Sequence, residues 1–250
     1  MDPRWRELIG MAREATAEAA AATAVGSAKN ILMNKAATAG LLRERPHGVF
    51  SFPAMTRHFC RLMREELDHF ERSGMPRVPP NTMNKNGVLL YELGMYEGLL
   101  DPLLEQFIVP LSSALYASRK HEHTPSASTL DHSRSFTVSY EPDKTFDLAY
   151  HYDDSEITLN VNLGGDFEGG ELLFGGLHGE PPEAHRSRYP HFHREGMGLM
   201  HRGAHCHEAV PVEEGQRVNL IMWCRSTDVR RHGKCAMCGE ERKVETAAAH

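Results

Sequence analysis

Hydrophobic residues recur at helical spacing in three segments of the first half of the chain. A run rich in Ala, Glu and Arg covers residues 7–24, and apolar residues three and four positions apart follow over 54–73 and 101–117. This spacing places apolar side chains on one face of a helix. We therefore predict three helices and assign residues 1–128 to a helical region that packs on the rest of the protein.

After Thr129 the pattern changes to short runs in which apolar and polar residues alternate, separated by Gly, Pro and Asp. Alternation with a period of two is typical of strands with one buried face. The candidate strands are 135–141, 147–152, 157–163, 171–174, 198–200, 204–209 and 217–224. Many short strands with glycine-rich turns predict a double-stranded β-helix (jelly roll) over 129–228, so the fold class is mainly β with α. The interval 175–195 is predicted to be a long loop.

Composition narrows the function classes. With 250 residues and 40% hydrophobic content, the chain can bury one full core. A net charge of −6 and a pI near 6.2 argue against a nucleic-acid partner. No apolar run reaches the length of a membrane span, and the charged N-terminus does not resemble a signal peptide. The five scattered cysteines favour a reducing compartment, so we expect a cytoplasmic or nuclear protein.

Two short polar segments far apart in the sequence suggest a metal site. His151 and Asp153 are two residues apart on a predicted strand, so their side chains point to the same face. Two histidines and one carboxylate leave other metal positions open, which suits non-haem Fe(II) that must bind a cosubstrate and O₂. The third ligand must come from another strand. Spacing alone does not choose between His201, His205 and His207.

Arg217 favours one of these histidines. A chelating keto acid needs its far carboxylate held about one cosubstrate length from the metal, and a guanidinium offers an always-charged fork of donors. The turn 213–215 would bring Arg217 back alongside His207. The spacing therefore favours His207 as the third ligand, with His201 and His205 as polar neighbours. Together these residues predict an Fe(II)- and 2-oxoglutarate-dependent oxygenase.

The same segments resemble a known family. The matching runs are HYDDSEITLNVNL from His151, FEGGEL from Phe167 and LMHRG from Leu199, the last leading to His207 and Arg217. They are similar to the prolyl- and lysyl-hydroxylase type of 2-oxoglutarate oxygenase. The closest similarity is to the 2-oxoglutarate- and iron-dependent oxygenase domain-containing proteins, over roughly residues 80 to 240.

The resemblance implies roles for individual residues. It makes His151, Asp153 and His207 the iron ligands, Arg217 the partner of the distal carboxylate of 2-oxoglutarate, and Tyr140 a hydrogen-bond partner of the same cosubstrate. It implies hydroxylation of a peptidyl proline or lysine by O₂, coupled to decarboxylation of 2-oxoglutarate to succinate. The expected partner is a protein or peptide substrate, and ascorbate is a candidate supporting reductant. The sequence does not indicate an oligomeric state.

Two alternatives remain open at this point. One is a catalytically silent jelly-roll binding module that holds a partner through the interval 175–195. The other is a small-molecule oxygenase of the same fold, or a cupin-type metal enzyme without a keto acid, which would give Arg217 no role.

The tail 229–250 contains a separate cluster. Cys235 and Cys238 follow His232, and Cys224 lies a short distance before them. A structural zinc site needs four ligands, and only three are clustered here. We therefore predict that the two tail cysteines are reduced thiols that the oxygenase site does not need.

Overall fold

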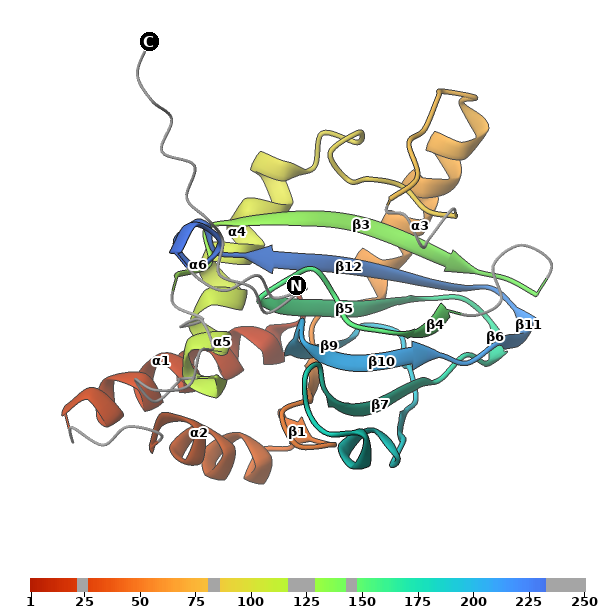
Figure 1. The fold of residues 1–250 in the computed structure, drawn as a ribbon. Coiled ribbons are helices and arrows are strands. Elements are labelled where there is room, and N and C mark those ends of the chain that lie inside the picture. The colour runs from red at the N-terminus through yellow and green to blue at the C-terminus, as the bar shows by residue number, and fades with distance from the viewer. Residues whose placement is uncertain (22–26, 81–85, 117–128, 143–147, 233–250) are drawn as a thin grey trace, which may run out of the picture.

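A computed structural model describes residues 1–21, 27–80, 86–116, 129–142 and 148–232. Its β core consists of two antiparallel sheets that face each other (Figure 1). The larger sheet has the strand order β1 (Arg43–Glu44), β2 (Phe50–Pro53), β9 (Met197–Arg202), β5 (Ile157–Gly164), β12 (Arg217–Arg225) and β3 (His132–Tyr140). The smaller sheet has the order β4 (Leu148–His151), β10 (His205–Ala209), β7 (Leu172–Leu177) and β8 (Tyr189–His191).

A two-stranded ribbon, β6 (Phe167–Gly169) with β11 (Val212–Gly215), lies at one end of the two sheets. The predicted jelly-roll core with helical support is confirmed. All seven strands expected after Thr129 are present, with ends shifted by a few residues.

Alternation along the strands separates two environments. On β5, Ile157, Leu159, Val161 and Leu163 belong to the apolar core between the larger sheet and the helices. The intervening Thr158, Asn160 and Asn162 are also buried, but because strand side chains alternate they face the interior between the two sheets. The sequence thus forms an apolar layer on one side of this sheet and a polar interior on the other.

The helices are α1 (Pro3–Ala21), α2 (Ser27–Thr38), α3 (Arg57–Arg72), η1 (Tyr96–Leu100), α4 (Asp101–Leu103), η2 (Leu104–Ile108), α5 (Val109–Leu115), η4 (Pro182–His185) and α6 (Thr227–His232). Trp5 of α1 is fully buried, with its ring 5.3 Å from Phe52 of β2 and 4.9 Å from Phe107 of η2. The N-terminal helices are therefore joined to the β core by a shared aromatic cluster.

The predicted helix 101–117 departs from regular geometry. The π-helical turn η1 precedes it and a second one, η2, lies inside it, and each is followed by a short α-helical stretch with proline near its start, Pro102 and Pro110. Proline lacks the N–H that a continuous α-helical ladder needs. The apolar spacing is thus right for a helix, but the ladder is interrupted.

Several short elements escaped the sequence analysis. Strands β1 and β2 lie inside the region expected to be helical, and β8 lies inside the interval 175–195 expected to be loop. That loop prediction is wrong for β8, an edge strand containing Pro190 that pairs only with β7. Proline is tolerated at sheet edges, and such a strand leaves no alternating apolar pattern.

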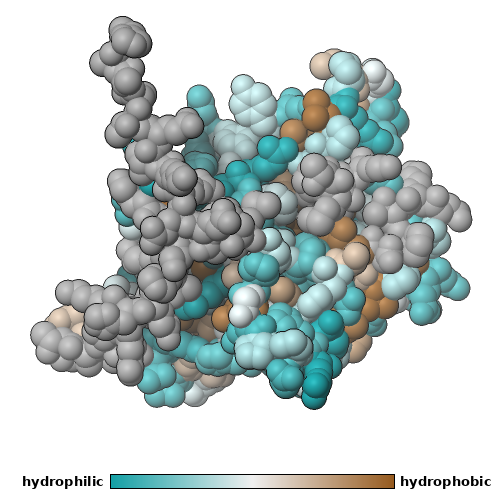
Figure 2. Space-filling view, viewed as in Figure 1, coloured by the Kyte–Doolittle hydropathy of each residue, from teal (hydrophilic) through white to brown (hydrophobic). Residues whose placement is uncertain are grey.

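In Figure 2 the coloured part of the displayed face is mostly hydrophilic, interrupted by small hydrophobic patches. Among the helices of the described segments, none combines the length and apolar character that a membrane crossing requires.

A candidate metal and cosubstrate site

The three predicted ligands lie close together, at the end of β4 and on the neighbouring strand β10. His151 ends β4 and pairs in register with His207 of β10, and Asp153 follows two residues after β4. The Asp153 Oδ1 atom lies 3.7 Å from His151 Nε2 and 4.0 Å from His207 Nε2. The ligand atoms of this group all lie within 4.8 Å of one another, and Asp153 and His207 are buried. Two nitrogens and one carboxylate oxygen therefore converge as a metal site requires.

Backbone carbonyls orient the two imidazoles. The Nδ1 atom of His151 lies 2.7 Å from the Ala149 carbonyl oxygen, and Nδ1 of His207 lies 2.9 Å from that of His205. A carbonyl accepts only, so each Nδ1 bears the proton and each Nε2 keeps a lone pair for a metal.

The carboxylate of Asp153 is fixed in a similar way. Thr158 Oγ1 donates to Asp153 Oδ2 over 2.6 Å, and Ser155 Oγ lies 2.8 Å from the same hydroxyl. Oδ2 is thus engaged by Thr158, while Oδ1 faces the two imidazoles.

The protonation states also suit a cation. Burial lowers the pKa of His207 to about 4, against the opposing influence of Asp153. Burial alone would raise the pKa of Asp153, but the neighbouring imidazoles of His207, His151 and His201 outweigh it and hold that pKa well below its usual range. At neutral pH His207 is therefore neutral and Asp153 ionised, the forms that bind metal.

The structure distinguishes between the three histidines that sequence spacing left as candidates for the third ligand. The register of β10 against β7 shifts between His205 and His207, and His205 Nε2 lies 2.9 Å from the Gly175 carbonyl oxygen, away from Asp153. His201 is fully buried on β9, with Nε2 3.9 Å from Asp153 Oδ2 and its ring 4.9 Å from that of His207. Within the described residues only His207 joins the compact ligand group.

Arg217 lies at the start of β12, directly opposite Tyr140 of β3. Its side chain is completely buried, its Cζ atom is 4.1 Å from the Tyr140 ring centre, and Nη1 donates to the Gly170 carbonyl. Within the described residues, Nε and Nη2 have no hydrogen-bond partner. Burial lowers the pKa of Arg217, but a guanidinium remains charged at neutral pH. A buried cation with two unused donors calls for an anion, and a carboxylate fits its fork.

A narrow cavity of about 30 Å³ adjoins the triad and reaches Tyr140, the residue against which Arg217 packs. It is lined by all three triad residues and by Tyr140, and further by Phe136, Val138, Leu148, Thr158, Asn160, Leu172, His201, Ile221 and Trp223. Among the described residues the indole Nε1 of Trp223 is also buried without a partner. The cavity volume is that of about one water molecule, so lining side chains would have to move for a dicarboxylate to enter.

Comparisons with known proteins agree with this geometry. The family model of the OGFOD2-like domain matches residues 2–120. The mouse 2-oxoglutarate and iron-dependent oxygenase domain-containing protein 2 is 43% identical over 190 residues, which cover 76% of this chain and 52% of the mouse protein. The chain is a relative of these oxygenase domain-containing proteins. The resemblance seen in the sequence is confirmed, and it extends to the N-terminal helices, where the sequence analysis had not recognised it.

Two further similarities concern hydroxylases and fold. The rat multifunctional procollagen lysine hydroxylase and glycosyltransferase LH3 is 27% identical over 202 residues, covering 73% of this chain and 24% of that protein. The crystal structure of the non-heme alpha ketoglutarate dependent carbocyclase SnoK from nogalamycin biosynthesis matches with a TM-score of 0.50 and 13% identity, covering 73% of this chain and 81% of the other. This second match supports the fold alone. The chain spans about half the length of the curated oxygenase relatives it matches.

Proposed function

We propose that this chain is an Fe(II)- and 2-oxoglutarate-dependent dioxygenase in which His151, Asp153 and His207 bind the iron. The main support is the combination of this triad with the buried donors of Arg217, which have no partner among the described residues and lie against Tyr140 in the wall of the cavity beside the triad. A metal site alone would not need a buried guanidinium, and a guanidinium alone would not need the triad.

The proposed roles follow from the contacts. Arg217 donates to the distal carboxylate of 2-oxoglutarate, and the Tyr140 ring packed against the guanidinium orients it. When bound, Fe(II) together with O₂ would supply the oxidising power needed to break an unreactive C–H bond. In the overall reaction, substrate C–H, O₂ and 2-oxoglutarate give substrate C–OH, succinate and CO₂. The apolar side chains beside the triad, among them Phe136 and Trp223, limit the access of water.

For the substrate we propose a peptidyl proline or lysine. The name of the rat relative includes a lysine hydroxylase activity. A cavity of about 950 Å³ also opens beside His205 and His178, and its size suits an extended side chain with its flanking backbone. The ring of His178, in the wall of this cavity, stacks at 4.0 Å on that of Tyr152, the residue next to His151 in the chain.

The alternatives explain less of the site. A silent binding module has no need for three converging ligands, and a cupin-type enzyme leaves the cation of Arg217 without an anion. We also propose an intracellular location, because the three cysteines among the described residues are unpaired and buried: Cys60, Cys206 and Cys224. Cys235 and Cys238 lie outside the described residues, so the tail prediction stays a prediction.

The test combines two readouts. The purified chain is incubated with Fe(II), ascorbate, 2-oxoglutarate and a panel of proline- and lysine-containing peptides. Succinate is quantified, and the peptides are examined by mass spectrometry for the gain of one oxygen atom. We expect succinate and oxidised peptide in equal amounts, and neither with Asp153→Ala. Succinate without oxidised peptide would contradict the substrate class, and no succinate with any addition would contradict the oxygenase.

A further inference from the structure

His193 is a partly buried histidine that the proposed function does not use. It follows β8, the edge strand of the smaller sheet. Its Nε2 atom is buried without a hydrogen-bond partner among the described residues, as are Nε and Nη2 of Arg217. Leaving a buried N–H unpaired is costly, so a native protein seldom does so without a ligand or water to accept it.

A chain of amides fixes the tautomer of His193. The Gly164 backbone N–H donates to Asn162 Oδ1 over 3.1 Å, so Asn162 Nδ2 must be the group that donates to Asn219 Oδ1 at 3.2 Å. Asn219 Nδ2 then donates to Asn160 Oδ1 at 2.6 Å and points to His193 Nδ1 at 3.5 Å. Nδ1 therefore accepts, and the proton of the neutral ring is on Nε2.

The unpaired Nε2–H shares an environment with Arg217. Asn219 and Arg217 are two residues apart on β12, so their side chains lie on the same face, toward the interior between the sheets. The charge of Arg217 adds to burial in lowering the pKa of His193 well below its ordinary value. A neutral imidazole beside a guanidinium offers one more donor to an anion, and it adds no charge.

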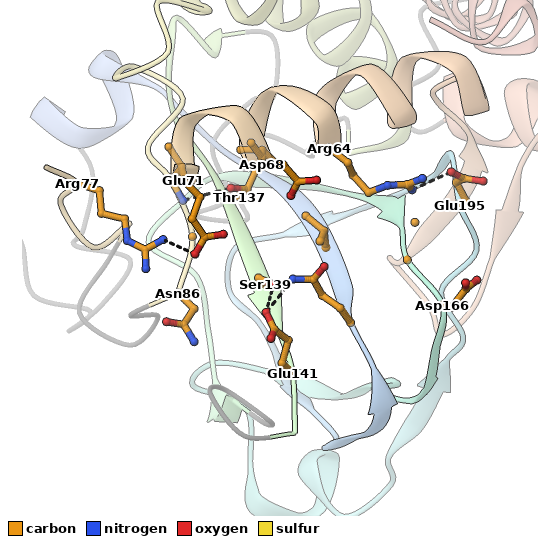
Figure 3. Close-up of a pocket in the computed structure, with 17 residues that line it drawn as sticks. Arg64, Asp68, Glu71, Arg77, Asn86, Thr137, Ser139, Glu141, Asp166 and Glu195 are labelled. Atoms are coloured by element: carbon orange, nitrogen blue, oxygen red, sulfur yellow. Dashed lines mark hydrogen bonds and ion pairs between the residues drawn. The ribbon is translucent and has the colours of Figure 1, made fainter. Parts of the chain in front are cut away.

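The backbone around His193 is held in place from two sides. Two residues after His193, the Glu195 carboxylate accepts a hydrogen bond of 2.9 Å from Arg64 Nη1 of α3 (Figure 3). Both residues line a cavity of about 370 Å³ on the outer face of the larger sheet. The next amide, Gly196 N–H, donates to the Asn162 carbonyl at 2.9 Å. The His193 ring thus extends from an anchored segment.

We propose that His193 donates its Nε2–H to the distal carboxylate of 2-oxoglutarate, so that this carboxylate is bound jointly by β12 and by the segment after β8. The inference rests on the proposed use of 2-oxoglutarate. It makes His193 a binding and specificity residue, because a keto acid without a second carboxylate cannot accept this hydrogen bond.

Two substitutions separate this role from a structural one. Glutamine can place an amide N–H near the position of Nε2, whereas asparagine is shorter and retains only a polar group near Nδ1, facing Asn219. We would measure the Kd of 2-oxoglutarate by calorimetry, with Mn(II) replacing Fe(II) to prevent turnover, in wild type, His193→Gln, His193→Asn and the exposed neighbour Arg194→Gln as control. Mn(II) affinity and the thermal midpoint are recorded for each protein.

We expect His193→Asn to weaken 2-oxoglutarate binding by about tenfold or more, as the loss of a hydrogen bond to a charged group predicts. His193→Gln and Arg194→Gln should stay within about threefold of wild type, since they keep that donor, and Mn(II) affinity should be unchanged throughout. The reverse order, with asparagine tolerated and glutamine not, would show that His193 only anchors its segment through Asn219. Equal affinity in all four proteins would also overturn the proposal.

The same titrations distinguish this failure from failure of the proposed function. If wild type binds 2-oxoglutarate and Arg217→Met does not, a normal result for His193→Asn refutes only the role of His193. If wild type itself fails to bind 2-oxoglutarate in the presence of Mn(II), the cosubstrate assignment is wrong.

Discussion

Replacing Arg217 by methionine should remove cosubstrate binding without destabilising the protein. In the protein without ligand, Arg217 is a fully buried cation with two unpaired donors and one bond to the Gly170 carbonyl. Exchanging a buried, poorly paired ion for an apolar side chain of similar length is often neutral or stabilising by about 1–4 kcal/mol. The lost bond to Gly170 costs about 1 kcal/mol, so the unliganded variant should be as stable as wild type or more stable.

Binding should change in the opposite direction. Two charge-assisted hydrogen bonds to a carboxylate contribute about 3–5 kcal/mol together, which corresponds to roughly 10²–10⁴-fold in Kd. Thermal denaturation with Mn(II), with and without 2-oxoglutarate, measures both effects. At a concentration about 100 times its Kd, 2-oxoglutarate should stabilise wild type by about 2.7 kcal/mol, and the variant should gain almost nothing.

A matched control is Arg134→Met. Arg134 is a half-buried arginine on β3 that donates to the Pro80 carbonyl and does not line the cavity beside the triad. It should keep the full stabilisation by 2-oxoglutarate. The reasoning would be refuted if Arg217→Met lowered the midpoint of the unliganded protein substantially and yet kept the 2-oxoglutarate response, because Arg217 would then be a structural residue.

The remaining predictions concern the metal, the core and the tail. Thr158→Val should weaken Mn(II) binding about 10–100-fold in a calorimetric titration, because Asp153 loses the 2.6 Å hydrogen bond that orients it; an unchanged Kd would exclude that role. Trp5→Ala should lower the free energy of unfolding in urea by about 3–5 kcal/mol, since a fully buried indole leaves a cavity; a loss below about 1 kcal/mol would mean that α1 is not part of the core. The double change Cys235→Ser, Cys238→Ser should leave succinate formation and the thermal midpoint unchanged, and elemental analysis of wild type should find no stoichiometric zinc; one zinc per chain, lost in the double variant, would contradict this.

The sequence predicted the elements in which a regular pattern meets a buried face. Alternation in β5 and β12 identified both central strands, because one face of each packs on the helices. Elements without such a face were missed. Strand β8 is short and at an edge, and α2 is nearly as apolar on one side as on the other.

Only part of the site was predictable from the sequence, because the rest depends on register and contacts between different strands. Spacing within a strand places His151 and Asp153 on one face, but it does not distinguish His205 from His207, whose surroundings differ through the register shift in β10. His193 could not have been found from the sequence. Its environment depends on Asn219, a residue of another strand, and on a tautomer that a chain of amide hydrogen bonds determines.

One molecule of 2-oxoglutarate should span the triad metal and Arg217. The most direct measurement is the Kd of 2-oxoglutarate by anaerobic calorimetry in three samples: wild type with Fe(II), wild type freed of metal by a chelator, and Asp153→Ala with Fe(II). We expect binding at least about tenfold tighter in the first sample than in the other two, because only there does the metal hold the keto acid end. Equal affinity in all three samples would contradict it.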